Sequence, residues 1–192
     1  MKRIFAHLIV GSVLMTLAGA AHAQGLGQPN QPVVKPLTVK VGAFFPTDSR
    51  AKKNSNSTQI SAGIDYAFGK TGSNNPSLPS VYVDYNGGNK NGGHVNSYGA
   101  GIGVRSFTTT PAGNNKQNFS PYFGAGVGVY RVDIKDTSVT PSVSGTTTSI
   151  GGKVLAGVEF GGGLLVEANY QMLPSRKGVN PSGFGVQVGA RF

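Results

Sequence analysis

The segment Gly183–Phe192, GFGVQVGARF, decides the fold, because apolar residues alternate along it with polar or small ones without a break. Successive side chains of a β-strand point to opposite faces of a sheet. One face of this strand would carry the apolar side chains from Phe184 to Phe192. The other face would carry glycines with Gln187 and Arg191. The segment therefore predicts a strand with one apolar and one polar face.

The same alternation recurs upstream, and turn-forming clusters of Gly, Asn, Ser and Pro separate the segments. With the terminal one there are eight segments: Leu37–Phe45, Ile60–Phe68, Val81–Tyr85, Tyr98–Phe107, Pro121–Val132, Ile150–Phe160, Leu164–Met172 and Gly183–Phe192. An even number of strands of about 9–11 residues is typical of barrels that cross a bilayer. Closure also removes unpaired edges. The sequence predicts an all-β protein, an eight-stranded antiparallel up-and-down transmembrane β-barrel over residues 37–192.

The apolar faces are expected to contact lipid, because aromatic residues lie near their ends. Such residues form the interfacial girdles of membrane barrels. The girdle candidates are Phe45, Tyr66, Phe68, Tyr85, Tyr98, Phe123, Phe160, Tyr170, Phe184 and Phe192. A soluble barrel with the apolar rows turned inward is the structural alternative, since alternation alone does not say which face is wet.

The opposite faces carry charged residues of both signs among glycines. These interior candidates are Lys40, Asp65, Asp84, Arg105, Lys153, Glu159, Glu167 and Arg191. The interior of an eight-stranded barrel is just wide enough for side chains to fill, and buried charges require partners. We therefore expect an interior plugged by ion pairs, such as Arg105 or Lys153 with Glu159 or Glu167.

The N-terminus has the pattern of an export signal, which predicts that residues 1–23 are cleaved. Lys2 and Arg3 precede an apolar stretch, and Ala21-His22-Ala23 resembles a cleavage site. Residues 24–36 would then form a periplasmic lead. The formal charge of +10 falls to about +8 without Lys2 and Arg3, which favours an anionic partner. For an exported protein we expect lipid phosphates rather than nucleic acid.

The chain offers little for catalysis or metal binding. It has no cysteine, and after residue 23 it keeps one histidine, His94. We therefore expect no metal site and no cofactor. Ser97 lies three residues from His94, and this spacing places two side chains on opposite faces of a strand. The sequence predicts that the protein is not an enzyme.

Three motifs carry a resemblance to the small outer-membrane β-barrel domain superfamily, which includes the OmpA barrel and the OmpX-like and OmpW-like proteins. They are Val188-Gly189-Ala190-Arg191-Phe192, Val41-Gly42-Ala43-Phe44-Phe45-Pro46 and Pro121-Tyr122-Phe123-Gly124-Ala125-Gly126-Val127-Gly128. The resemblance implies a location in the outer membrane of a Gram-negative bacterium and periplasmic termini. It also implies that the last strand, ending at Phe192, is the signal read by the barrel-assembly machinery.

With periplasmic termini, the outer loops are expected at residues 46–59, 86–97, 133–149 and 173–182. The periplasmic connections are expected at 69–80, 108–120 and 161–163. The cations expected in the outer loops are Arg50, Lys52, Lys53, Lys90, Lys135, Arg176 and Lys177. They could bind lipopolysaccharide phosphates, or they could serve only to keep the loops solvated.

Two functions remain open from the sequence. The favoured one is a structural or surface-interaction role, with a side-chain-filled interior and basic outer loops. The alternative is a narrow, porin-like or OmpW-like barrel for small apolar molecules. Glycines such as Gly101 and Gly126 could leave a cavity for such a solute, or could merely make room for long inward side chains. The oligomeric state is not predicted.

Overall fold

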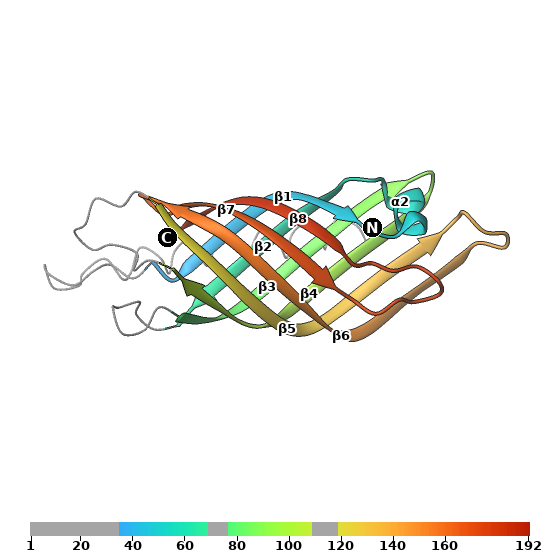
Figure 1. Ribbon diagram of the computed structural model, residues 1–192. Helices are drawn as coiled ribbons and strands as arrows, with labels where there is room; N and C mark the ends of the chain where they lie inside the picture. The colour runs from blue at the N-terminus through green and yellow to red at the C-terminus, as the bar shows by residue number, and fades with distance from the viewer. Residues whose placement is uncertain (1–34, 69–76, 109–118) are drawn as a thin grey trace, which may run out of the picture. The chain divides into compact units, whose positions relative to one another are not determined.

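The structure of the protein is a computed structural model that describes residues 35–68, 77–108 and 119–192. The expected signal peptide, all but the last two residues of the expected lead, and most of two expected periplasmic connections lie outside the described residues. The described chain forms eight strands and one short helix (Figure 1). The strands are β1 Leu37–Pro46, β2 Gln59–Ala67, β3 Ser77–Lys90, β4 Gly93–Phe107, β5 Phe119–Asp136, β6 Val143–Phe160, β7 Leu164–Met172 and β8 Gly183–Arg191.

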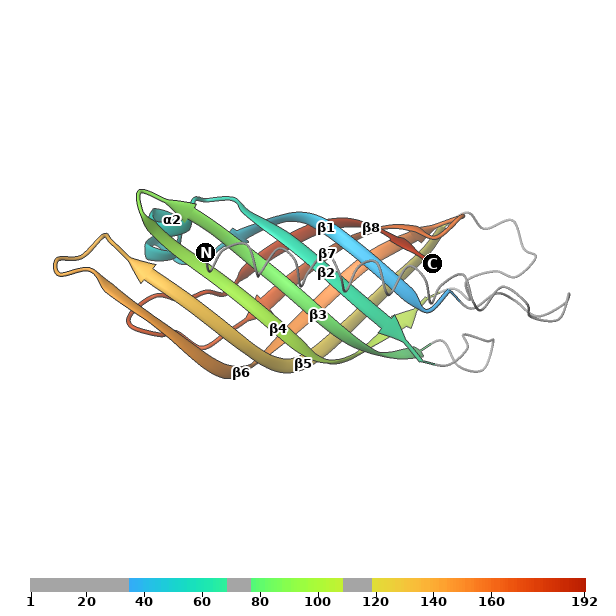
Figure 2. The ribbon, with the colours of Figure 1, turned by 180° about the vertical axis from the view of Figure 1, so that it is seen from behind.

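The strands form one closed sheet. Each strand pairs antiparallel with the next, and β1 also pairs with β8, with Thr38 opposite Arg191 and Pro46 opposite Gly183. Figure 2 shows from behind how the tilted strands of the β1–β4 side complete the barrel. The predicted eight-stranded antiparallel barrel is confirmed, since every strand of the described chain pairs with a neighbour on each side over at least part of its length.

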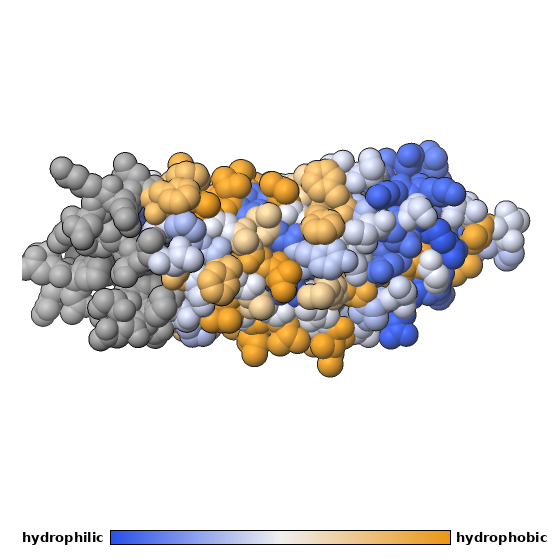
Figure 3. Space-filling model, viewed as in Figure 1, coloured by the Kyte–Doolittle hydropathy of each residue, from blue (hydrophilic) through white to orange (hydrophobic). Residues whose placement is uncertain are grey.

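The apolar faces of the strands point away from the lumen. Ile150 and Ile102 expose 73% and 63% of their surface, whereas Lys40 and Glu167, on the opposite faces, expose 1% and 0%. On the face shown in Figure 3, the exposed apolar residues lie across the middle of the barrel, and the hydrophilic residues gather at the α2 end. Exposed apolar residues occur on all eight strands, from Val41 of β1 to Val188 of β8, so they form a band around the barrel. Such a band is the surface that a bilayer covers. The soluble alternative is therefore wrong.

Four neighbouring strands continue beyond this band. β3 to β6 have 14, 15, 18 and 18 residues, compared with 9 or 10 for the other four. The third strand is therefore much longer than the predicted Val81–Tyr85. Between the band and the α2 end, the outward positions of these strands carry polar residues such as Arg131 and Thr146. The alternation of apolar and polar residues therefore ends there, although the backbone pairing of β5 with β6 continues to Asp136 and Val143.

Two of the expected outer loops are consequently wrong in extent. Most of 86–97 is strand, because β3 and β4 are joined by the two-residue turn Asn91-Gly92, whose φ angles are 51° and 76°. Positive φ at both positions is the type I′ geometry that Asn-Gly favours in tight hairpins. Most of 133–149 is also strand, and the connection of β5 to β6 shortens to 137–142. Lys90 and Lys135 thus lie on strands.

The connection between β1 and β2 contains a helix that the sequence reading missed. Helix α2 spans Ser49–Ser55, and the Asp48 carboxylate accepts a hydrogen bond from the Ala51 amide at 2.8 Å. This bond satisfies one of the amide groups that a helix start leaves free. Ala51 is fully buried, so α2 packs against the barrel end. Within the described residues, no helix is long and apolar enough to cross a membrane.

Candidate functional site

The centre of the lumen holds four charged side chains from four strands. Lys40 Nζ of β1 lies 2.8 Å from Asp65 Oδ2 and 2.7 Å from Glu167 Oε1. Arg105 Nη2 of β4 lies 2.6 Å from Asp65 Oδ2 and 3.1 Å from Glu167 Oε2. Tyr122 donates its hydroxyl to Glu167 Oε2 at 3.0 Å. Each cation therefore contacts both carboxylates, in a closed ring that joins β1, β2, β4 and β7 across the lumen.

Two further pairs lie along the lumen on either side of this ring. Lys153 Nζ lies 2.7 Å from Asp84 Oδ2 and 3.5 Å from the centre of the Tyr82 ring, a cation–π contact. Arg191 Nη1 lies 3.0 Å from Glu159 Oε2. All eight predicted interior residues thus face the lumen, as four cations and four carboxylates.

The expected partners are only partly those in the structure. Arg105 contacts Glu167, but Lys153 pairs with Asp84 and, at 3.9 Å, with Asp65. In the β6–β7 register Lys153 lies opposite Gln171 and Glu167 lies opposite Gly157. Four residues along a strand span about 13 Å, which is too far for an ion pair. Pairing of Lys153 with Glu159 or Glu167 is therefore wrong.

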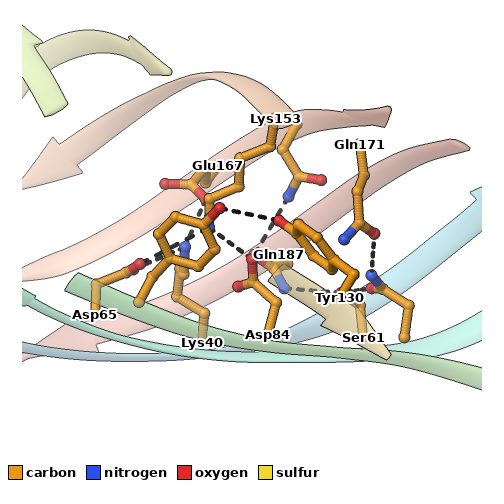
Figure 4. A network of polar contacts seen from close by, with 12 residues as sticks. Lys40, Ser61, Asp65, Asp84, Tyr130, Lys153, Glu167, Gln171 and Gln187 are labelled. Carbon is orange, nitrogen blue, oxygen red and sulfur yellow. Dashed lines mark hydrogen bonds and ion pairs between the residues drawn. The ribbon is translucent and has the colours of Figure 1, made fainter. Parts of the chain in front are cut away.

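A row of amides and hydroxyls, which sequence reasoning missed, continues the network toward the α2 end (Figure 4). Gln187 donates to Ser61, Ser61 donates to Asn86, and Asn86 donates to Gln171, with distances between 2.6 and 2.8 Å. Ser61, Gln171 and Gln187 lie on the polar faces of predicted strands, whereas Asn86 lies just beyond the predicted third strand, in an expected outer loop. Their contacts depend on how the strands are staggered.

Two tyrosines fill the lumen beside this row. The hydroxyl groups of Tyr82 and Tyr130 lie 3.0 Å apart and share a hydrogen bond. A Cβ at Gly99 would lie 2.1 Å from the Tyr130 ring, and one at Gly126 would lie 2.8 Å from the Tyr82 ring. These two glycines therefore make room for the inward tyrosines. Of the two roles that the sequence left open for the lumen glycines, a cavity for a solute or room for inward side chains, the structure shows the second at these positions.

The α2 end of the lumen is apolar and is covered by the helix. The buried cluster there consists of Ala51, Tyr82, Val95, Tyr130, Val132, Ile134, Leu173 and Val179. Above it, Asp136 accepts hydrogen bonds from Arg50 Nη2 at 2.6 Å and from Asn54 Nδ2 at 2.8 Å. Burial acts to raise the pKa of the Asp136 carboxyl, but the hydrogen bonds from Ser138, Asn54 and Arg50 outweigh it and hold this pKa well below its usual range.

The seven predicted outer cations separate into two groups. Arg50 is bound to Asp136 and to the Gly178 carbonyl, and Lys177 donates to the Ser144 carbonyl. The other five are exposed at the α2 end: Lys52, Lys53, Lys90, Lys135 and Arg176. The structure therefore leaves these five side chains exposed to an external anion, but does not gather them into one pocket.

The remaining candidates lie apart from the interior network. His94 and Ser97 are both on β4, where His94 faces outward, 3.3 Å from Asp133, and Ser97 is buried. No group of three or more potential metal-binding side chains occurs in the described part of the chain. Phe192 follows β8 directly and exposes 54% of its surface.

A closed eight-stranded barrel with an apolar outer band and a charged, filled lumen defines a membrane-spanning β-barrel protein of the outer-membrane type. The family model of the outer membrane protein beta-barrel domain matches residues 11–192, and the chain belongs to this family. The protein is therefore an outer-membrane β-barrel, located in the outer membrane.

Solved structures of outer-membrane barrels are similar in fold. Neisserial surface protein A is 17% identical with a TM-score of 0.58, over 81% of this chain and 96% of that chain. The N-terminal barrel of Pseudomonas aeruginosa OprF is 14% identical with a TM-score of 0.47, over 81% and 97%. Ail of Yersinia pestis is 13% identical with a TM-score of 0.46, over 82% and 99%. No curated protein matches.

Proposed function

We propose that this protein is a closed barrel that acts as a structural element of the outer membrane and presents the α2 end to the outside. The observation that carries this proposal is the succession of side-chain clusters along the lumen of the described chain. From one end to the other, the lumen holds an apolar cluster with Phe107 and Tyr122, the ion-pair ring, the amide row, the tyrosine pair and the apolar cluster beneath α2.

The energetics of the ring support a closed state. Opening a path for a solute requires separation of at least one fully buried ion pair. Breaking a buried pair by removing one partner costs about 3–5 kcal/mol, because it leaves an uncompensated charge. Lys40, Asp65 and Glu167 each make two or more such contacts, so displacement of one side chain disrupts several.

The proposed orientation rests on the difference between the two ends of the barrel. The α2 end carries the extended strands with polar outward residues and the five exposed cations. At the opposite end, β6 and β7 are joined by the tight turn Gly161–Gly163. Short turns are typical of the periplasmic side. Cleavage of an export signal at residue 23 and recognition of Phe192 by the assembly machinery belong to the same proposal.

The exposed cations fit the phosphates of outer-leaflet lipopolysaccharide. Lys52 and Lys53 lie in the last turn of α2, and Lys135 lies on the outer part of β5. Each juxtamembrane cation near an anionic surface contributes about 1 kcal/mol, and salt screens this attraction. Replacement of all five by glutamine is expected to weaken binding of the refolded barrel to vesicles containing lipid A, and equal binding at low salt would contradict this role.

Planar-bilayer conductance of the refolded chain, from residue 24 onward, tests the closed barrel. Heat-modifiable gel mobility first shows that the barrel has folded. We expect no discrete channels from the wild type and measurable channels from a Lys40→Ala/Glu167→Ala variant, which removes two of the four charged side chains of the ring. Discrete wild-type channels that a small apolar solute blocks would overturn the proposal in favour of the transport alternative.

A further inference from the structure

The outer half of β6 has a free backbone edge. The β6–β7 ladder ends at Gly152 opposite Met172, whereas β6 begins nine residues earlier, at Val143. Continued in the same register, β7 would place Pro174 opposite Ile150, and proline has no amide hydrogen to donate. Among the described residues, this part of β6 has a strand partner on one side only, β5.

The register shows which backbone groups face this edge. The Thr108 amide donates to the Pro121 carbonyl, so the backbone groups of Pro121 point toward β4. Backbone groups alternate in direction along a strand. The amides and carbonyls of the other odd-numbered residues of β5 therefore also point toward β4, and those of the even-numbered residues point toward β6. Ile134 of β5 lies opposite Gly145, so the odd-numbered residues of β6 bond back to β5. The amides and carbonyls that face away from β5 are therefore those of Ser144, Thr146, Thr148 and Ile150.

The part of the sheet that extends beyond the apolar band has a second edge, on β3, and that edge is covered by the segment after α2. On β3, Asn56 Nδ2 donates to the Asn89 carbonyl at 3.0 Å, and the Ser55 carbonyl packs so close to Gly88 that an added Cβ would lie 2.2 Å away. On the β6 edge, the hydrogen bond that the structure shows to a described residue outside β5 is the one from Lys177 to the Ser144 carbonyl. Natural sheets protect edges with charges, proline or bulges. The edge segment 143–151, VSGTTTSIG, contains no charged residue and no proline.

The charges around the edge are mainly positive. Lys177 Nζ donates to the Ser144 carbonyl, and the exposed side chains of Arg131 and Lys135 lie on the neighbouring strand. Asp133 is the acidic group among them, and it already contacts His94 and accepts a hydrogen bond from Thr146 Oγ1. An extended segment that runs along β6 would therefore be favoured if it carried carboxylates.

We propose that this edge binds an extended, acidic segment of an external protein as an added strand. Main-chain hydrogen bonds to residues 144–150 supply the affinity, as in other cases of strand addition, and Lys177 exchanges the Ser144 carbonyl for a carboxylate of the added strand. The inference rests on the proposed function in one respect, since an external partner reaches the edge only if the α2 end faces outward.

The probe is a blocked ten-residue peptide in which valine or threonine alternates with glutamate, titrated against the refolded barrel in lipid nanodiscs. We expect saturable shifts of the amide resonances of Thr146 and Thr148. Thr148→Pro removes an edge donor but leaves the β5 ladder intact, so it should weaken binding about tenfold. Thr148→Ser, the matched control, should bind as the wild type does. Heat-modifiable mobility checks that both variants fold.

Two further measurements separate strand addition from simple charge attraction. A peptide N-methylated at alternate amides keeps its charge but cannot form the ladder, and should not bind. Lys177→Glu should weaken binding of the unmodified peptide. No saturable shift at about 1 mM peptide, or equal binding of the N-methylated peptide or of the Thr148→Pro variant, would overturn the inference. Both barrel ends are accessible in nanodiscs, so this result is independent of orientation and conductance, on which the proposed function is tested.

Discussion

At the scale of single residues, Glu167 of β7 connects three other strands across the lumen. It is fully buried and contacts Lys40 of β1, Arg105 of β4 and Tyr122 of β5. Glu167→Gln leaves two buried cations with Asp65 as their shared carboxylate. We expect the free energy of unfolding to fall by about 3–5 kcal/mol. Urea unfolding in detergent, followed by heat-modifiable mobility, measures this change.

Glu159→Gln provides the matched control for this prediction. Glu159 contacts only Arg191 among the charged residues described, and its side chain exposes 13% of its surface. The loss should therefore be smaller than for Glu167→Gln. A Lys40→Met/Glu167→Leu double variant removes both charges and should recover much of the stability. Equal stability of wild type and Glu167→Gln would show that the ring does not stabilise the barrel.

Asp136 is expected to make the attachment of α2 dependent on pH. Its folded-state pKa lies below the ordinary value of 3.8, so its contribution is fully present above about pH 5 and is lost as the pH falls below 3.8 toward the folded-state value. The protection factors of the α2 amides, which correct for the slower intrinsic exchange at low pH, should therefore fall on acidification through this range. Asp136→Asn should lower these protection factors already at neutral pH, and Asp133→Asn should not.

The residues of the interior could be predicted from the sequence, but most of their partners could not. Alternation places Lys40, Asp84 and Lys153 on lumen-facing positions whatever the stagger of the strands. Which side chains meet depends on the register around the whole closed sheet. Asp84 meets Lys153 because β3 and β6 face each other across the lumen at that level, and no local pattern contains this information.

At the scale of elements, the glycine rows of β4 and β5 determine how the lumen is filled. Gly99→Val would drive a side chain into the Tyr130 ring, and we expect overpacking to cost about 1–3 kcal/mol. Ala100→Val, at the next position on the lipid-facing side of β4, should be nearly neutral. Urea unfolding of the two variants compares them, and equal stability would mean that the tyrosine is free to move aside.

The elements missed by the sequence reading are those beyond the apolar band. Strand pairing there is maintained by backbone hydrogen bonds and by the Asn91-Gly92 turn. The Asn-Gly dipeptide is a sequence signal for a tight β-hairpin, and it could have predicted that β3 and β4 continue to this turn. Helix α2 is too short to show an amphipathic period, and only the capping residue Asp48 marks its start. Its stability comes from packing of Ala51 and from Asp136, both of which depend on the tertiary structure.

At the scale of the whole molecule, the position of the bilayer follows from the apolar band. Val127, in the middle of the band on β5, exposes 50% of its surface, whereas Thr148 lies above the band on β6. Val127→Arg should cost about 2–4 kcal/mol in liposomes, and Thr148→Arg about 0–1 kcal/mol. Unfolding from liposomes in urea measures both. Similar costs at the two positions would place the membrane elsewhere on the barrel.

The ion pairs of the lumen also determine how the barrel responds to voltage. The eight interior residues comprise four cations and four carboxylates, so their formal charges cancel. A transmembrane potential acts on a mobile charge with about 2.3 kcal/mol per 100 mV, but it exerts no net force on a neutral group of side chains that moves together. We therefore expect planar-bilayer recordings to show no channel opening when the applied voltage is raised or reversed. The charged side chains of the lumen should then block conduction at every voltage and should not act as a voltage-dependent gate.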